Sequence, residues 1–556
     1  MKSTIKNIIA KYSKISLMGA ALFAGVSCEG ILEEQVISNI GNDYLNTPAG
    51  LNDGLHAAYS SFRAWYGTER GNNFTVFGTD TYTNGADGGF KFMNFYTSDF
   101  DSQNAHVREL WDQFYQGINT ANAVIDRAPE VEGLSEEIKA RRIAEAKFIR
   151  AHHYFILVQL FGPVDLQLSE SVVPSTEVTR SPVADIYAAI INDLQAAIPD
   201  LENVGQSSDY GRATRATAEH LLGRVYLTKG TSEAAENDDF ANAEPLLQSV
   251  IDNYSFRLLD NFGDVHAFGN EVNDEVVFAV QYGRNQLTNG GGNNSHVFFL
   301  MEYDVQPGMR RDTQNGRPFK RYMPTDYTYN VIFADRENDS RYENSFKQVY
   351  YSNNPGTFNT TFDQSKDQVT FAAGDTAIYV PGYEMSEEER ARKPYQVLVP
   401  SAYTERLFAT MKKHMDPGRV DLTQFEGGRD YIAFRLADTY LLLAEAQLRQ
   451  DKIAEATENI NVVRRRAAFP GREEQMEITP AEMDMEMIIE ERARELLGEQ
   501  QRWLDLKRWG ILVERVTAHN SKAIGIEDYH VLRPIPQNQI DRTDGNEANF
   551  PQNPGY

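Results

Sequence analysis

The chain has 556 residues, of which 41% are hydrophobic, so it is long enough to bury a sizeable core. Its formal net charge is −26 at pH 7, which argues against a general nucleic-acid role because phosphate binding requires a basic surface. The single cysteine, Cys28, excludes a disulfide framework within the chain.

The first 27 residues have the features of a secretory signal peptide. Several lysines precede the apolar run Ile15–Ala24, which is too short to span a membrane. The small residues before Cys28 resemble a bacterial lipobox, and the acidic segment Glu29–Glu34 resembles the surface-export signal of Bacteroidetes lipoproteins. The resemblance implies cleavage before Cys28, lipidation of Cys28 and a lipidated tether over residues 28–48. The alternative is an ordinary signal peptide with an incidental cysteine.

Apolar residues recur at helical spacing in two parts of the mature chain. We predict helices at 49–66, 105–127, 136–161, 183–198, 213–228, 241–254, 431–449 and 453–468. The last two segments are similar to a tetratricopeptide pair, which buries its apolar face only by stacking on another pair. The helical repeats, assigned mainly to 49–66, 105–255 and 430–512, are therefore predicted to form one superhelical core within a single domain, 49–556.

The segment Met485–Leu512 is amphipathic and indicates a pair of helices, or one broken helix, with Gly498 as the expected weak point. The adjacent carboxylates Glu490 and Glu491 lie among arginines, so we interpret them as solvated or ion-paired structural residues and not as a glycosidase pair. Trp503 and Trp509 are predicted to belong to the core and not to contact ligand.

Two stretches lack helical periodicity. Residues 67–104 are rich in Gly, Asn, Asp and aromatic residues, and a loop of this length is usually functional or disordered. Its aromatic content argues against disorder. Residues 256–428 combine strand-like runs at 275–282, 297–303 and 375–380 with turns, and we predict an irregular insertion against the helical core.

Aromatic rings on a polar, glycine-rich loop suit a platform on which a sugar ring stacks while nearby polar groups bond its hydroxyls. Trp65, at the edge between helix and loop, is the strongest stacking candidate. The residues predicted to bind ligand here are Trp65, Tyr66, Asp80, Tyr82, Asn84, Phe92 and Tyr96. The alternative is that most of these aromatic rings attach the loop to the helices.

A second candidate cluster combines tyrosines with arginines, which are typical of recognition surfaces. Its predicted binding residues are Phe298, Tyr303, Arg310, Tyr327 and Tyr329. Whether these side chains face a ligand or a partner protein stays open.

The sequence contains no motif for catalysis. It lacks a His-Glu-x-x-His motif, a phosphate-binding loop and a nucleophile elbow. The neighbours His152 and His153 point about 100° apart on a helix and cannot share a metal ion. No cofactor or metal site is predicted, although the Asp- and Asn-rich loops leave structural calcium possible without the spacing of an EF-hand.

Several stretches together carry a family resemblance. They are the lipobox-like site at Cys28, Ala144–Val164, Arg435–Ala446, Glu490–Trp509, Leu532–Pro536 and Pro551–Tyr556. In this order they resemble the SusD/RagB family of outer-membrane nutrient-binding lipoproteins, and they extend over nearly the whole mature chain.

The resemblance implies a mostly α fold, in which a right-handed superhelix of about four tetratricopeptide-like pairs supports an irregular, loop-rich ligand-binding half with short strands. It implies a non-enzymatic protein, lipid-anchored in the outer membrane and facing the cell exterior. Such a protein binds a polysaccharide or oligosaccharide and delivers it, as a lid, to a TonB-dependent SusC-like transporter. The alternatives are a peptide-binding RagB-like lipoprotein and a protein-only interaction scaffold.

Overall fold

The computed structural model describes residues 42–362 and 367–556. The predicted signal peptide, Cys28 and most of the predicted tether lie outside these residues. Within the described residues, no helix is both long enough and apolar enough to cross a membrane.

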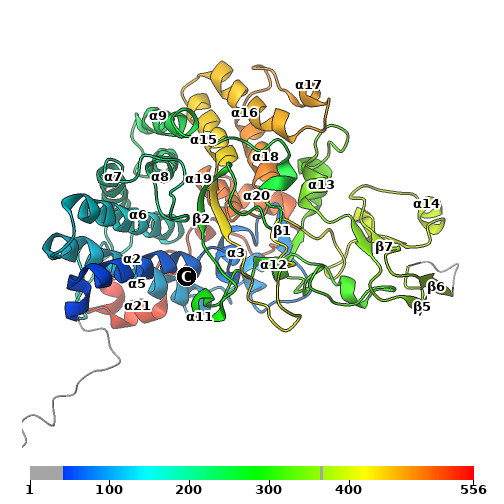
Figure 1. Ribbon diagram of the computed structural model, residues 1–556, viewed down its shortest axis with the longest axis horizontal. Helices are drawn as coiled ribbons and strands as arrows, with labels where there is room; N and C mark the ends of the chain where they lie inside the picture. Colours follow the sequence, from blue (N-terminus) through cyan, green and yellow to red (C-terminus); the bar gives the residue numbers. More distant parts are fainter. Residues whose placement is uncertain (1–41, 363–366) are drawn as a thin grey trace, which may run out of the picture.

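Eight helices of at least 13 residues form the core of the described structure (Figure 1). They are α2 (Pro48–Ser60), α5 (Ala105–Arg127), α6 (Glu136–Phe161), α7 (Val183–Ala197), α8 (Arg215–Lys229), α9 (Asp239–Asp252), α15 (Leu436–Leu448) and α16 (Ile453–Ala467). Each helix in this order packs against the next. Because α9 contacts α15, the helices before residue 255 and those after residue 430 form one superhelical array, as predicted.

Helix α6 begins and ends where its sequence predicts. The Ser135 hydroxyl accepts the backbone N–H of Ile138 at 3.3 Å, which satisfies one of the free donors of the first turn. Gly162 follows the last turn with a φ of 69°, a conformation that costs glycine little. Pro163 comes next and cannot continue the helix.

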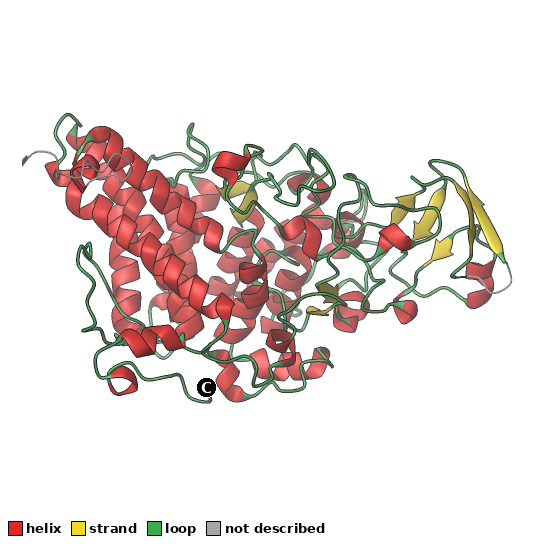
Figure 2. Ribbon diagram, turned by 90° about the horizontal axis from the view of Figure 1, so that it is seen from below, coloured by secondary structure: helices red, strands yellow, loops and turns green. Residues whose placement is uncertain are grey.

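Short strands and turns make up most of the other half. The strands are β1 (Tyr82–Asn84), β2 (Val276–Val280), β3 (Tyr322–Pro324), β4 (Val349–Tyr351), β5 (Gly356–Asn359), β6 (Gln368–Phe371), β7 (Thr376–Tyr379), β8 (Gln396–Val397) and β9 (Tyr431–Arg435). They pair as β1–β3, β2–β9, β4–β7–β8 and β5–β6. Figure 2 shows the last two sheets at the end of the molecule farthest from the long helices.

The remaining helices are short. They are α3 (Glu69–Thr75), α4 (Phe92–Phe95), α10 (Phe262–Val265), α11 (Gln286–Asn289), α12 (Ser295–Phe298), α13 (Arg341–Ser345), α14 (Glu387–Ala391), α17 (Glu473–Met476), α18 (Met485–Glu495), α19 (Arg502–Arg508), α20 (Leu512–His519) and α21 (Gln537–Arg542). The 3-10 turns are η1 (Asn42–Asn46), η2 (Ser61–Ala64), η3 (Ala128–Glu130), η4 (Tyr303–Val305), η6 (Pro400–Ala402), η7 (Asp528–Val531) and η8 (Asn546–Ala548), and η5 (Thr328–Ile332) is π-helical.

Three local predictions are wrong. Residues 431–435 are not helical, because they pair with β2 as strand β9 before α15 begins. The strand predicted at 297–303 is absent and Ser295–Phe298 is a helical turn, since a short apolar run does not distinguish a strand from a buried helical segment. The loop predicted at 67–104 contains α3, β1 and α4.

The segment Met485–Leu512 is divided as predicted. Helix α18 ends at Glu495, Gly498 has a φ of 74°, and α19 begins at Arg502. Trp503 is fully buried under the Arg533 guanidinium, which lies 3.9 Å from its ring centroid. The segment is therefore part of the core.

Buried ion pairs connect α18 to the rest of the protein. The guanidinium of Arg435 lies 2.6 Å from Glu495, 2.7 Å from Glu499 and 3.0 Å from Glu275. All four side chains are at most 5% exposed. Since an unpaired charge in such a position is very unfavourable, each group depends on the others.

The Glu490–Glu491 pair is structural, as predicted. Glu491 is fully buried and lies 2.6 Å from Arg341 and 2.8 Å from both Arg464 and Arg494. Glu490 pairs with Arg494 at 2.5 Å. These contacts occupy both carboxylates with ion pairs.

The network predicts loss of stability in acid. Burial alone would raise the pKa of Glu495, but Arg466, Arg435 and Arg341 outweigh it and lower the pKa from 4.5 to about 2. Because the carboxyl binds protons more weakly in the folded state, its stabilising contribution is present above pH 4.5 and is lost as the pH falls toward 2. The urea concentration at the midpoint of unfolding should therefore fall as the pH is lowered from 7 to 2.5. A constant midpoint would contradict this account.

Candidate functional site

The structure buries most of the residues predicted to bind ligand. Ten of them are at most 5% exposed: Trp65, Tyr66, Asp80, Tyr82, Asn84, Tyr96, Phe298, Tyr303, Tyr327 and Tyr329. Phe92 is half-buried and packs near Phe90 and Phe100, and Arg310 is exposed. The prediction of an exposed aromatic platform is therefore wrong.

Trp65 shows why the platform does not form. Its ring is 1% exposed, stacks on Phe74 at 6.1 Å and meets Phe114 at the same centroid distance. Its carbonyl accepts a hydrogen bond from the Gln500 amide at 3.1 Å. Residues from α3, α5 and the segment after α18 thus enclose Trp65, and its ring serves as core.

Asp80 is also a structural residue. Its two carboxylate oxygens accept hydrogen bonds of 2.8 and 2.6 Å from Arg502. Burial alone would raise the pKa of Asp80, but Arg502 and then Arg515 outweigh it and hold the pKa below its usual range. The ion pair fastens the 67–104 segment to α19.

The other polar and aromatic groups of this segment bond inward. The Tyr96 hydroxyl donates to the Gly78 carbonyl at 2.7 Å, and the Tyr82 hydroxyl contacts the Met411 sulfur at 3.4 Å. The Asn84 side-chain oxygen accepts from Asn94 at 3.1 Å. Polar residues that indicated a surface loop instead satisfy buried hydrogen bonds.

The second predicted cluster is dispersed. The Tyr303 hydroxyl donates to the Gly316 carbonyl at 2.5 Å, and Tyr329 is buried against Tyr403. The Arg321 guanidinium covers Phe298 at 5.3 Å. Tyr327 stacks on His519 and lines a separate hollow of about 400 Å³. These residues do not share one surface.

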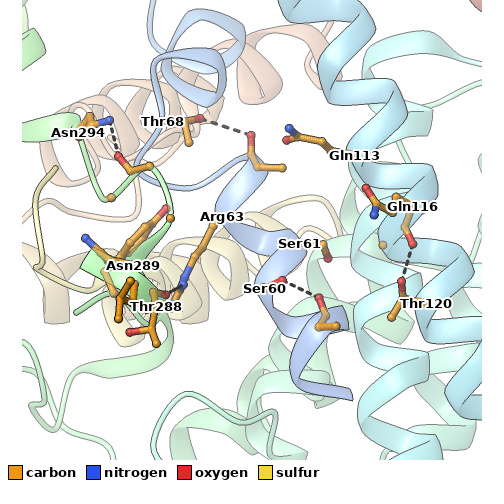
Figure 3. Close-up of a pocket in the computed structure, with 18 residues that line it drawn as sticks. Ser60, Ser61, Arg63, Thr68, Gln113, Gln116, Thr120, Thr288, Asn289 and Asn294 are labelled. Carbon is orange, nitrogen blue, oxygen red and sulfur yellow. Dashed lines mark hydrogen bonds between the residues drawn. The ribbon is translucent and has the colours of Figure 1, made fainter. Parts of the chain in front are cut away.

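A cavity of about 600 Å³ lies between the superhelix and the irregular half (Figure 3). Its walls come from α2 and η2, from α5 and from the segment 282–294. Its lining residues are Ala57, Ser60, Ser61, Arg63, Ala64, Thr68, Gln113, Gln116, Gly117, Thr120, Tyr282, Leu287, Thr288, Asn289, Gly290, Gly291, Gly292 and Asn294. In Figure 3, Gln113, Gln116 and Thr120 lie on α5, opposite Thr288 and Asn289, with Ser60, Ser61 and Arg63 between them.

Arg63 is held in a fixed position in this cavity. Its Nε donates to the Gln281 carbonyl and its Nη1 donates to the Thr288 carbonyl, both at 2.8 Å. Its guanidinium lies 5.1 Å from the centroid of the Tyr282 ring. The side chain thus links η2 to the opposite wall.

Tyr282 is fixed from both ends. Its hydroxyl donates to the Tyr66 carbonyl at 2.6 Å, and its backbone N–H donates to the Asp430 carboxylate at 2.7 Å. Burial raises the pKa of the Tyr282 phenol, so the hydroxyl keeps its proton and remains a donor. Tyr282 is the aromatic residue of the cavity lining.

The loop that forms the far wall is held by the Asn289 side chain and by its close approach to residues 426–427. The Asn289 amide donates to the Gly427 carbonyl at 3.1 Å, and its oxygen accepts the Gly283 N–H at 2.9 Å. Gly292 has a φ of 70°, and a Cβ there would lie 2.8 Å from the Cα of Glu426. Only glycine fits this position, which places the loop close to residues 426–429.

The lining chemistry is that of a binding site. Residues with amide, hydroxyl, guanidinium and phenol side chains line the cavity, and the described lining residues include no carboxylate, imidazole or thiol. Side chains of these types can hydrogen-bond a polar ligand, and Tyr282 and the exposed Leu287 offer apolar surface. A glycosidase pair of carboxylates is not among the lining residues.

One cluster of carboxylates in the described residues has the spacing to hold a metal ion. It consists of Glu236, Asp238 and Asp239. However, the Lys229 ammonium lies 2.7 Å from Glu236 and 2.8 Å from Asp239. The lysine supplies the positive charge that a cation would bring.

Sequence reasoning missed Arg63, Tyr282 and the α5 glutamines. Arg63 lies two positions before Trp65, and the apolar periodicity of the segment favours the tryptophan ring as a binding candidate over the arginine. Gln113 and Gln116 are exposed positions of a helix that was correctly predicted. Their polar side chains three residues apart on one face were the available signal.

The fold and the cavity define a helical-repeat protein of ligand-binding type. The chain belongs to the SusD family, because the family model described as "SusD family" matches residues 274–556. A second model, described as "Starch-binding associating with outer membrane", matches residues 32–227. These matches confirm the family resemblance.

Similar proteins with curated names are homologous over most of the chain. SusD-like protein P25 of Formosa agariphila is 25% identical over 93% of this chain and 94% of its own length. The starch-binding protein SusD of Bacteroides thetaiotaomicron is 25% identical over 77% of this chain and 75% of its own length.

Solved structures share the fold. A SusD homolog from Bacteroides thetaiotaomicron has a TM-score of 0.71 at 21% identity, over 93% of this chain and 98% of its own. A laminarin-binding SusD-like protein has a TM-score of 0.65 at 22% identity, over 92% of this chain and 100% of its own. At these identities the likeness confirms the mostly helical, superhelical fold.

Proposed function

We propose that this protein binds a polysaccharide or oligosaccharide in the cavity between α5 and the 282–294 segment, without cleaving it. The observation that carries the proposal is the lining, in which amides and hydroxyls surround a fixed Arg63 and Tyr282. Sugar hydroxyls pair with such groups, and the apolar face of a sugar ring packs on an aromatic ring. The starch-binding and laminarin-binding relatives support the same ligand class.

The protein is further proposed to act at the outer membrane. Lipidation of Cys28 would anchor it there facing the exterior, and it would deliver the glycan, as a lid, to a TonB-dependent SusC-like transporter. The matching family description, which names association with the outer membrane, supports this location. Purification of the full-length chain from detergent-solubilised membranes should recover the transporter with it. Recovery of this protein alone under mild detergent would contradict the lid role.

Peptide recognition has less support. That alternative depended on the tyrosines and arginines at 303–329, and Tyr303, Tyr327 and Tyr329 are buried. A role as a protein-only interaction scaffold would not account for the polar cavity. We therefore propose no second function.

The Gln116 side chain provides a direct test. It is exposed at the cavity wall, so Gln116→Ala should leave thermal stability unchanged. Loss of one or two hydrogen bonds to the glycan should weaken binding by about 0.5–1.5 kcal/mol, or roughly 2- to 10-fold. Affinity electrophoresis in gels that contain a retained polysaccharide measures the effect.

The matched control is Gln314→Ala, an exposed glutamine outside the cavity lining. It should bind as the wild type does. If no polysaccharide retards the wild-type protein, the proposed function is wrong. If Gln116→Ala and Gln314→Ala are retarded equally, ligand does not contact this wall.

A further inference from the structure

Among the described residues that line the cavity, Arg63 alone is charged. Its Nε and one N–H of Nη1 are used in bonds to carbonyl oxygens, and these neutral acceptors leave its positive charge uncompensated. Nη2 has no hydrogen-bond partner among the described residues. A guanidinium has five N–H donors, so Arg63 keeps donors available for a ligand.

Neighbouring arginines differ from Arg63 in this respect. Arg70 pairs with Glu109, and Arg284 pairs with Asp416 at 2.6 Å. Within the described parts of the chain, Arg63 makes no ion pair. Its guanidinium is therefore a site of unbalanced positive charge in a protein whose net charge is −26.

The carboxylate behind Tyr282 interacts with Arg63 without forming an ion pair, so it offsets the positive charge only in part. Asp430 lies outside the cavity lining and accepts the Tyr282 N–H at 2.7 Å. Burial raises the pKa of Asp430 to about 6, with a smaller contribution from Glu271, while the hydrogen bond from the Tyr282 N–H and the charge of Arg63 lower it. Asp430 thus lies within electrostatic range of Arg63 but makes no ion pair with it.

Arg63 also lies where two hollows meet. A second hollow of about 280 Å³ shares Ser60 and Arg63 with the main cavity. Its other arginine, Arg212, is neutralised by Glu145 at 2.8 Å and by Asp209. A chain of sugars that extends from one hollow to the other would pass directly over Arg63.

We propose that Arg63 binds the acidic group of a glycan, so that the ligand is an anionic oligosaccharide bearing carboxylates or sulfates. This inference rests on the proposed function and names its substrate class. A guanidinium matches the planar oxygens of both groups and forms charge-assisted hydrogen bonds with them. Since the acidic protein repels polyanions at long range, recognition depends on this local cation.

The test uses a glycan array with neutral, uronate-bearing and sulfated members, probed with the mature protein. Alginate and carboxyl-reduced alginate form a matched pair that differs only at the acid, and a sulfated galactan distinguishes sulfate from carboxylate. We expect the bound members to be anionic. Calorimetry on a bound member should show affinity that falls as NaCl rises.

Two variants separate charge from structure. Arg63→Gln should weaken binding of the anionic glycan about 10-fold or more and remove most of the salt dependence of binding. Arg63→Lys keeps the positive charge, so it should retain part of the affinity and part of the salt dependence. A purely structural role would lower thermal stability and affinity without changing the salt dependence.

The results of the array distinguish the proposed function from the proposed role of Arg63. Binding confined to neutral glycans would contradict the proposal that the ligand is anionic, but it would agree with the proposed glycan-binding function. Anionic binding that Arg63→Gln does not change overturns the role of Arg63. Absence of binding to any member overturns both the proposed function and this inference.

Discussion

Replacement of Arg435 by methionine is expected to lower the free energy of unfolding by about 3–5 kcal/mol, because it leaves buried carboxylates without their shared partner. Arg435 is 1% exposed and donates to Glu275, Glu495 and Glu499. It also donates to the Glu495 carbonyl at 2.7 Å, so the strand β9 and helix α18 would lose a direct connection. Urea unfolding followed by circular dichroism measures the change.

The control is Arg392→Met, at the end of helix α14. Arg392 also forms an ion pair, with Glu388, but both side chains are more than 70% exposed. Exposed pairs contribute about 0–1 kcal/mol, so this variant should unfold near the wild-type midpoint. Equal midpoints for Arg435→Met and the wild type would show that the buried network is not a main source of stability.

A phenylalanine at Gly291 is expected to weaken glycan binding by at least about 100-fold, or roughly 2.7 kcal/mol, without unfolding the protein. Gly291 lines the cavity, and a Cβ there would meet no atom within 4 Å. Its φ is not positive, so the position lies outside the left-handed region that disfavours a side chain. The phenyl ring would occupy space that the ligand requires.

Gly89→Phe is the matched control. A Cβ at Gly89 would also meet no atom within 4 Å, and this glycine lacks a positive φ and lies outside the cavity lining. Affinity electrophoresis should retard Gly89→Phe as strongly as the wild type, while Gly291→Phe should migrate freely. Strong retardation of both variants would place the ligand elsewhere.

The helical half was predictable because periodicity and end signals act locally. The bounds of α5 and α6 agree with those predicted, since Asn104 and Ser135 cap the helices and Gly162 ends the second one. The structural role of Glu491 was also predicted from the arginines around it. Its partner Arg341 lies 150 positions earlier in the sequence, and no local pattern relates the two.

The cavity could not be predicted from the spacing of residues along the sequence. Arg63 and Thr288 are separated by 225 positions, and their contact depends on how the irregular half folds back on α2 and α5. Trp65 and Arg63 both lie near the end of the same helical segment. Burial by Phe74 and Phe114, which is a tertiary effect, makes one of them core and leaves the other at the cavity.

The prediction of an exposed binding loop at 67–104 was wrong because the polar residues of this segment are typical of surface loops. Asn94 and Asp80 instead bond to partners inside the protein, and the aromatic rings between them fill the core. Composition describes the residues of such a segment but does not determine which way they face.

The most direct test is a crystal structure of the mature protein with an oligosaccharide that it retains in affinity electrophoresis. We predict sugar density between α5 and the 282–294 segment, in contact with Arg63 and Tyr282. Density confined to another surface, such as the hollow beside Tyr327 and His519, with this cavity free of sugar would contradict the account.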